Sequence, residues 1–261
     1  LPVLQRAFVA LGMAPEREAI IAFTHNILFD FAVSAHLLVS EPNRLAEFLA
    51  EEPARPLFLR PSLVYHFTRL WHFNRITFWR NFWAVLQRGE THLRQIVRLV
   101  LPAVIVNEAQ TPEDLSPLLE RLRTGQPQGA DAVAFLLQAL RVLTSPKKTL
   151  WAAFLRSTGP NLDHRFAWDA GTIATGIVES KEPLPGSAIS DCGQLGRRLL
   201  AWAWAGRKSE QRHWFERLTG VAAIPLVAKT YATGANEARG LLRDVLAVVG
   251  EPDFPIDCIH R

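Results

Sequence analysis

The chain has 261 residues, of which 49% are hydrophobic and 21% charged, and its formal net charge is +4. This composition is typical of a globular protein and argues against extensive disorder. The small positive charge does not by itself indicate nucleic acid binding. No apolar run approaches the roughly 20 residues that span a bilayer.

The ends and the cysteines of the chain suggest its context. The first residue is Leu1 rather than a methionine, and the last residues, PIDCIHR, look like the start of another helix. We therefore expect a fragment of a longer protein, cut at both ends. Cys192 and Cys258 lie far apart and form no metal-ligand pattern. Reduced thiols in a cytoplasmic protein are favoured over a disulfide.

The N-terminal stretch predicts a helix, a short strand and a second helix. Apolar spacing predicts the first helix over 2–11, and the β-branched run at 19–23 predicts the strand. Thr24 can cap the second helix. This helix has an apolar stripe that we expect to be buried, formed by Leu28, Phe31, Ala32, Ala35 and Leu38.

His25 falls in the first turn of that second helix. Exposed backbone N–H groups and the helix dipole favour an anion at this position. A histidine there can donate a hydrogen bond to a phosphate. The alternative is a surface or locally bonded histidine, because one such residue is weak evidence for a site.

The stretch from Phe23 to Leu38, FTHNILFDFAVSAHLL, resembles the end of the winged-helix domain in STAND-type ATPases, the NACHT and related signalling proteins. The resemblance rests on the order of an aromatic residue, a histidine, apolar residues, an acid and a small-residue stripe: Phe23, His25, Ile27, Leu28, Asp30, Phe31, Ala32, Ala35 and Leu38. The segment RPSLVYHFTRLWHFNRITFWRNFW, further along the chain, is similar to the helical region that follows this module in large bacterial STAND ATPases.

This resemblance implies a function for the chain. Residues 1–41 would be the C-terminal part of a winged-helix domain, and residues 42–261 a helical, HEAT-like sensor region. His25 would contact the β-phosphate of ADP, so ADP and ATP are cofactors of the full-length protein and not of this chain alone. The chain would be a regulatory, partner-sensing fragment of a switch used in bacterial defence or signalling, and the parent would oligomerise.

The chain departs from a complete family member in its catalytic motifs. It has no G-x-x-x-x-G-K-[ST] loop and no identifiable Walker B strand. We therefore expect no enzymatic activity from the chain alone. A stand-alone α-solenoid that binds protein or nucleic acid is the alternative function, and a helical enzyme is a third class without a visible catalytic constellation.

From residue 42 onward, apolar residues at helical spacing predict one helix after another. The expected helices cover 43–51, 62–73, 75–88, 91–107 with a break at Pro102, 111–123, 130–143, 147–157, 163–180, 190–205, 210–218, 221–230 and 236–249. We expect an all-α protein, an irregular HEAT-like α-solenoid of about a dozen helices, with a globular helical bundle as the alternative.

Two groups mix arginines with other side chains that could bind nucleic acid or an acidic partner. Trp71, Trp79 and Trp83 lie among arginines, as in proteins that stack on single strands, but their spacing favours a packed core. The second group comprises Arg197, Arg198, Arg207, Lys208, Arg212 and Arg217. A solvated surface is favoured for it over a binding site for phosphate or an acidic partner.

The remaining polar candidates favour structural roles. His66 and His72 are six residues apart and do not share a helix face, so a zinc site is not expected. Asp163, His164 and Asp169 could suggest acid–base chemistry, but no motif ties a nucleophile to them. Cys192 has no obvious basic neighbour in the sequence and is not proposed as a nucleophile.

Overall fold

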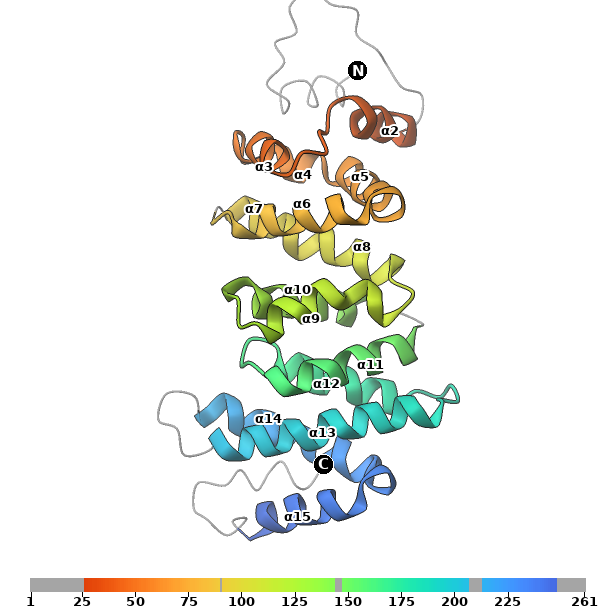
Figure 1. Ribbon diagram of the computed structural model, residues 1–261, viewed down its shortest axis with the longest axis vertical. Helices are drawn as coiled ribbons and strands as arrows, with labels where there is room; N and C mark the ends of the chain where they lie inside the picture. Colours follow the sequence, from red (N-terminus) through yellow and green to blue (C-terminus); the bar gives the residue numbers. More distant parts are fainter. Residues whose placement is uncertain (1–25, 90, 144–146, 207–212, 248–261) are drawn as a thin grey trace, which may run out of the picture. The chain divides into compact units, whose positions relative to one another are not determined.

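The computed structural model describes residues 26–89, 91–143, 147–206 and 213–247. These residues form fourteen α-helices and three 3-10 helices and contain no strand, so the predicted all-α class is confirmed (Figure 1). The expected helix at 2–11 and strand at 19–23 lie outside the described residues. None of the described helices is both long and apolar enough to cross a lipid bilayer.

The helices group into two compact units that divide after Glu108. The first unit holds seven of the described α-helices: α2 (Asn26–His36), α3 (Pro42–Ala50), α4 (Arg55–Phe58), α5 (Arg60–Phe73), α6 (Arg75–Gln87), α7 (Thr91–Leu99) and α8 (Leu101–Glu108). Helix α2 belongs to this first unit. The expected domain boundary after residue 41 stays a prediction.

In the first unit, α5 packs against α2, α6 and α8, while α6 also packs against α3 and α7. The core lies between α5 and α6, where Phe67, Trp71, Phe78 and Phe82 are fully buried. Burying each of these rings removes a large apolar surface from water and contributes about 2–3 kcal/mol. Unit 1 therefore has a hydrophobic core of its own.

Local sequence signals explain where several of these helices begin. The Glu41 carboxylate accepts hydrogen bonds from the backbone N–H groups of Asn43 and Arg44 and caps α3. Asn74 Oδ1 accepts from the Thr77 N–H at 3.1 Å and starts α6 directly after α5. The predicted break near Pro102 is confirmed, because α7 ends at Leu99 and α8 begins at Leu101.

The second unit contains the remaining described elements: η1 (Pro112–Leu115), α9 (Ser116–Arg123), α10 (Pro127–Leu143), α11 (Lys148–Thr158), η2 (Gly159–Asn161), α12 (Ala167–Val178), α13 (Gly186–Gly206), α14 (His213–Lys229), η3 (Tyr231–Thr233) and α15 (Ala235–Leu246). Here α13 packs against α11, α12 and α14, and α10 packs against α9 and α12. Trp151, Phe154 and Phe166 are its largest fully buried side chains.

Several helices of the second unit differ from their predicted bounds, and the structure shows a local cause for two of the differences. The helix expected over 163–180 begins only at Ala167, because Asp163 instead forms a turn that accepts from the Arg165 N–H at 2.9 Å. The helices expected over 210–218 and 221–230 are one helix, α14, that continues through Gly220. A Cβ at Gly220 would lie 3.2 Å from Cβ of Ala203, so this glycine permits close packing on α13 rather than ending a helix.

Candidate functional site

His25, the predicted phosphate ligand, lies outside the described residues, and α2 begins directly after it at Asn26. The stripe that we expected to be buried is only partly so: Leu28 and Phe31 are exposed, Ala32 and Ala35 are half-buried, and Leu38 is buried. Val33 and Ser34 of α2 are buried as well. Asp30 Oδ1 accepts a hydrogen bond from Ser62 Oγ on α5 at 2.7 Å and fixes this orientation.

His66 is a buried residue of α5. Neither of its ring nitrogens, nor the buried Oγ of Ser34, has a hydrogen-bond partner among the described residues. Burial is the main reason that the pKa of His66 falls from 6.5 to about 4; the Ser34 backbone opposes this shift, and the nearby charge of Arg69 adds to it. His66 is therefore neutral at neutral pH, and it serves the packing of α2 on α5.

His72 does not join His66 in a metal site. The His72 Nε2 atom lies 2.9 Å from Oε2 of Glu108, at the exposed end of α5, while His66 points into the core. Among the described residues, no group of three or more histidine, cysteine, aspartate or glutamate side chains could hold a metal ion.

The tryptophans of α5 and α6 form a packed core, as their spacing predicts. Trp71, Trp79 and Trp83 are buried, and the Trp71 ring meets Phe78 edge-on with centroids 5.0 Å apart. The guanidinium of Arg75 lies 4.3 Å from the Trp71 centroid. Protein groups therefore cover these rings, and the rings offer no open stacking surface to a nucleic acid base.

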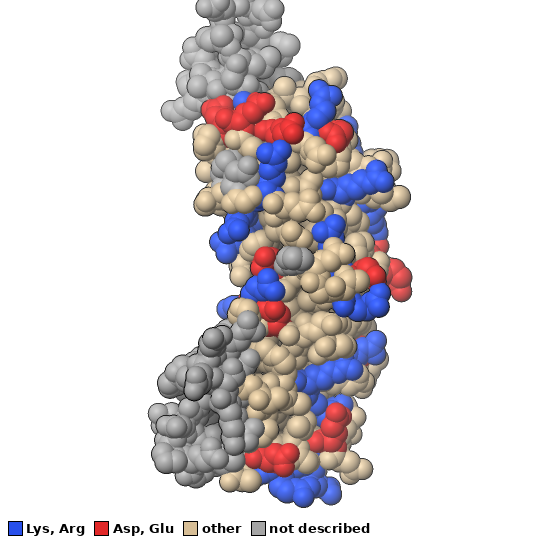
Figure 2. All heavy atoms as spheres, turned by 60° about the vertical axis from the view of Figure 1, so that its left-hand side comes forward, with Lys and Arg blue, Asp and Glu red and all other residues tan. Residues whose placement is uncertain are grey.

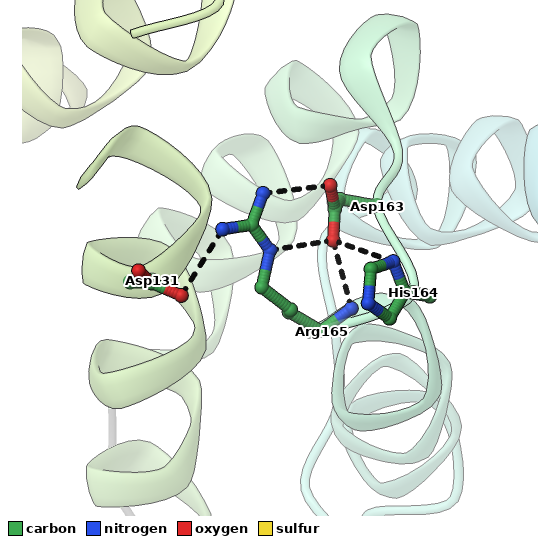
Figure 3. Close-up of polar contacts among 4 residues, drawn as sticks. All are labelled: Asp131, Asp163, His164 and Arg165. Carbon is green, nitrogen blue, oxygen red and sulfur yellow. Dashed lines mark hydrogen bonds and ion pairs between the residues drawn. The ribbon is translucent and has the colours of Figure 1, made fainter. Parts of the chain in front are cut away.

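Figure 3 shows a polar cluster that joins the turn before α12 to α10. The Arg165 guanidinium donates from Nε to Asp163 Oδ1 and from Nη2 to Asp163 Oδ2, both at 2.9 Å, and from Nη1 to Asp131 Oδ1 at 3.1 Å. His164 Nδ1 lies 3.2 Å from Asp163 Oδ1. Asp169 takes no part in this cluster and pairs with Arg141 of α10 at 2.5 Å.

The electrostatics of this cluster suit a structural role. Hydrogen bonds from Arg165 lower the pKa of Asp163 from 3.8 to about 2, and Asp163 raises the pKa of Arg165. Asp163 is thus a carboxylate at neutral pH whose two oxygens are occupied by Arg165. Arg165 was not among the residues singled out in the sequence, although its position two residues after Asp163 is the signal that could have identified it. The cluster joins the turn before α12 to α10, and Arg165 keeps Asp163 from taking up a proton near neutral pH.

The second basic group does not form one exposed patch. Arg197 is only 5% exposed and donates from Nε to Glu237 Oε2 at 2.7 Å, so the expected solvated position is wrong for this residue. Arg198 is exposed. The side chains of the other four members lie outside the described residues. Figure 2 shows positive and negative side chains scattered among uncharged ones, without a continuous basic surface in that view.

Cys192 is a buried thiol of α13. Burial and the neighbouring Asp191 raise its pKa to about 12, so it stays protonated at neutral pH and is a poor nucleophile. Cys258 lies outside the described residues.

The most distinctive exposed feature is an apolar surface on α2 and α5. Of the twelve large hydrophobic side chains that are exposed among the described residues, nine belong to the first unit. Five of these make up the α2–α5 face, and each is at least 39% exposed: Ile27, Leu28, Phe31, Val64 and Tyr65. The Phe31 and Tyr65 rings meet edge-on with centroids 5.8 Å apart, which joins the two helices into one surface. Large exposed apolar patches are typical of interaction sites.

Comparisons of the chain with protein-family models, with curated proteins and with solved structures found no match.

Proposed function

We propose that this chain is the partner-binding helical region of a STAND-type nucleotide switch. The single observation that carries the partner-binding role is the α2–α5 face, an apolar surface that no described residue covers. The chain performs no catalytic step of its own in this proposal. It works in the cytoplasm, and a protein is its partner.

The resemblance at Phe23–Leu38 supplies the nucleotide part of the proposal. His25 contacts the β-phosphate of ADP held by a nucleotide domain of the parent protein. The same stretch continues into α2, whose Asp30 is bonded to Ser62 of α5. The phosphate contact and the partner surface therefore lie on one short segment. A partner that prefers the open arrangement shifts the population away from the ADP-bound one.

The test is ADP release from the parent protein that carries both this chain and a nucleotide domain. We expect the His25→Ala variant to release a fluorescent ADP analogue faster than the wild type. His36→Ala, at the exposed end of α2, is the matched control and should leave the rate unchanged. Equal release by the His25→Ala variant and the wild type would remove the switch role.

A stand-alone helical scaffold without any nucleotide is the second candidate. The α2–α5 face favours this candidate, because its residues are exposed whether or not a nucleotide domain is present. A parent sequence without a P-loop supports this candidate over the switch. If its partner is a nucleic acid, binding should weaken steeply with salt, because neutralising phosphates releases counterions.

A further inference from the structure

Helix α2 is apolar on two sides, and described residues cover only one of them. Ser34 is buried, and Asp30 accepts a hydrogen bond from Ser62 of α5, so this side packs on α5. Leu28 lies two residues before Asp30 and therefore nearly opposite to it around the helix. Leu28 and Phe31 remain 50% and 46% exposed.

The uncovered side of α2 is an apolar stripe at helical spacing. We call it the outer stripe, and it consists of Leu28, Phe31, Ala32 and Ala35. A helix that is apolar all round is normally an interior helix, with neighbours on both sides. Among the described helices α2 packs mainly on α5, whereas α5 packs on α2, α6 and α8. A neighbour on the outer stripe must therefore come from outside the described residues.

The segment directly before α2 has the complementary property. The expected helix at 2–11 has one apolar side, and the run AIIAF at 19–23 is apolar throughout. A helix of about ten residues is marginal in water and gains its stability by packing its apolar side against other elements. The sequence before α2 therefore needs an apolar surface, and the nearest one along the chain is the outer stripe.

We propose that residues 1–25 pack on the outer stripe of α2, with the apolar side of residues 2–11 in contact with it. This contact makes α2 an interior helix and covers the α2 side of the α2–α5 face. Its regulatory consequence rests on the proposed partner-binding function: a partner of this face has to compete with the N-terminal segment of the chain itself.

The length of the connection permits this contact. Residues 12–25 span up to about 45 Å when extended, whereas α2, with 11 residues, is about 16 Å long. Gly12 and Pro15 favour a reversal of the chain direction before α2. The covalent connection also gives the segment an effective concentration on the order of millimolar at the outer stripe. This advantage favours the chain's own segment over a second copy of the chain.

Hydroxyl-radical footprinting of the whole 261-residue chain tests the contact, because the oxidation rate of a side chain reports its exposure to water. Leu4→Ser with Phe8→Ser should raise the oxidation rate of Phe31 by about threefold or more, since the segment loses apolar contacts. Gln5→Ser with Val9→Ser, on the other side of the expected helix, should leave that rate unchanged. An unchanged rate in the first variant, or an equal rise in both, overturns the proposal.

A second pair of variants alters the described side of the contact. Leu28→Ser, at a side chain 50% exposed, should raise the oxidation rate of Phe8 by about twofold or more. Leu57→Ser, at a leucine of α4 that is 57% exposed, is the matched control and should leave that rate unchanged. Phe73, which is 85% exposed, is the internal reference for the oxidant dose. A rise that is missing from Leu28→Ser, or equal in both variants, overturns the proposal.

Two further measurements separate the possible failures. Footprinting at several protein concentrations distinguishes the occupants, because a contact between two copies weakens on dilution and a contact within one chain does not. Protection of Phe31 that is lost on dilution would assign the outer stripe to a second copy and overturn the proposal. If the variants leave Phe31 unchanged while His25→Ala still accelerates ADP release from the parent protein, the contact is refuted and the proposed switch stands. The reverse pair of results refutes the switch and leaves the contact.

Discussion

At the scale of single residues, His66 makes the stability of the first unit depend on pH. Its pKa is about 4 when folded and 6.5 in the unfolded chain, so the folded state excludes a proton that the unfolded state accepts. The stabilising contribution of the neutral side chain is complete above pH 6.5 and is lost as the pH falls toward 4. The total loss is at most about 3.5 kcal/mol, because each pKa unit between 6.5 and about 4 corresponds to about 1.4 kcal/mol.

Urea unfolding of the wild type and of His66→Met between pH 7 and pH 4 checks this expectation. Carboxylates titrate in both proteins, so the difference between their free energies of unfolding isolates His66. We expect the wild type to lose more stability on acidification than His66→Met, while His36→Gln, exposed at the end of α2, should follow the wild type. Parallel curves for His66→Met and the wild type would contradict the lowered pKa.

At this scale the sequence predicts which side chains are buried better than it predicts which residues they pair with. The burial of Trp71 follows from helical spacing alone, because spacing decides which side of a helix is apolar. The pairing of Arg197 with Glu237 joins residues forty positions apart, and no local pattern links them. The predicted solvated position of Arg197 was wrong for this reason. The role of His25 stays a prediction.

At the scale of helices, glycines set how closely α13 approaches its neighbours. A Cβ added at Gly193 would lie 2.6 Å from Oγ1 of Thr233 and 2.9 Å from Oγ1 of Thr230. These hydroxyls donate to backbone carbonyls and cannot turn away without losing hydrogen bonds. We expect Gly193→Ala to lower the free energy of unfolding by about 1–3 kcal/mol through overpacking.

Gly176 of α12 provides the matched control, because a Cβ there would meet nothing within 4 Å. Gly176→Ala should raise the free energy of unfolding by about 0.5–1 kcal/mol, since alanine loses less backbone entropy in a helix. Thermal and urea unfolding of both variants measure the two effects. Changes of the same sign in both variants would show that helix propensity, and not close packing, dominates at Gly193.

The helix pattern was predictable, but the orientation of α2 was not. Caps and prolines mark helix starts in the sequence, as at Asn74 and Pro102. α2 is apolar around most of its circumference, so its pattern allows more than one side to face the core. The hydrogen bond from Ser62 to Asp30, between residues 32 positions apart, decides which side it is. A long-range polar contact of this kind leaves no periodic signal.

At the scale of the whole molecule, the chain has two hydrophobic cores. Phe82 belongs to the core of the first unit and Phe154 to that of the second, and both are fully buried. Truncating a buried phenylalanine to alanine costs about 3–5 kcal/mol. We expect scanning calorimetry to resolve two transitions, with Phe82→Ala lowering the midpoint of one and Phe154→Ala lowering the other. A single transition that both variants shift equally would show that the two cores unfold together.

The tryptophan cluster has an optical consequence. The rings of Trp71 and Trp79 are 6.0 Å apart, and those of Trp79 and Trp83 are 6.1 Å apart with an angle of 22° between their planes. Indoles this close share their excited states, and their coupling gives a circular dichroism signal that isolated indoles lack. Because these rings come from α5 and α6, that signal reports the integrity of the first unit without any attached dye.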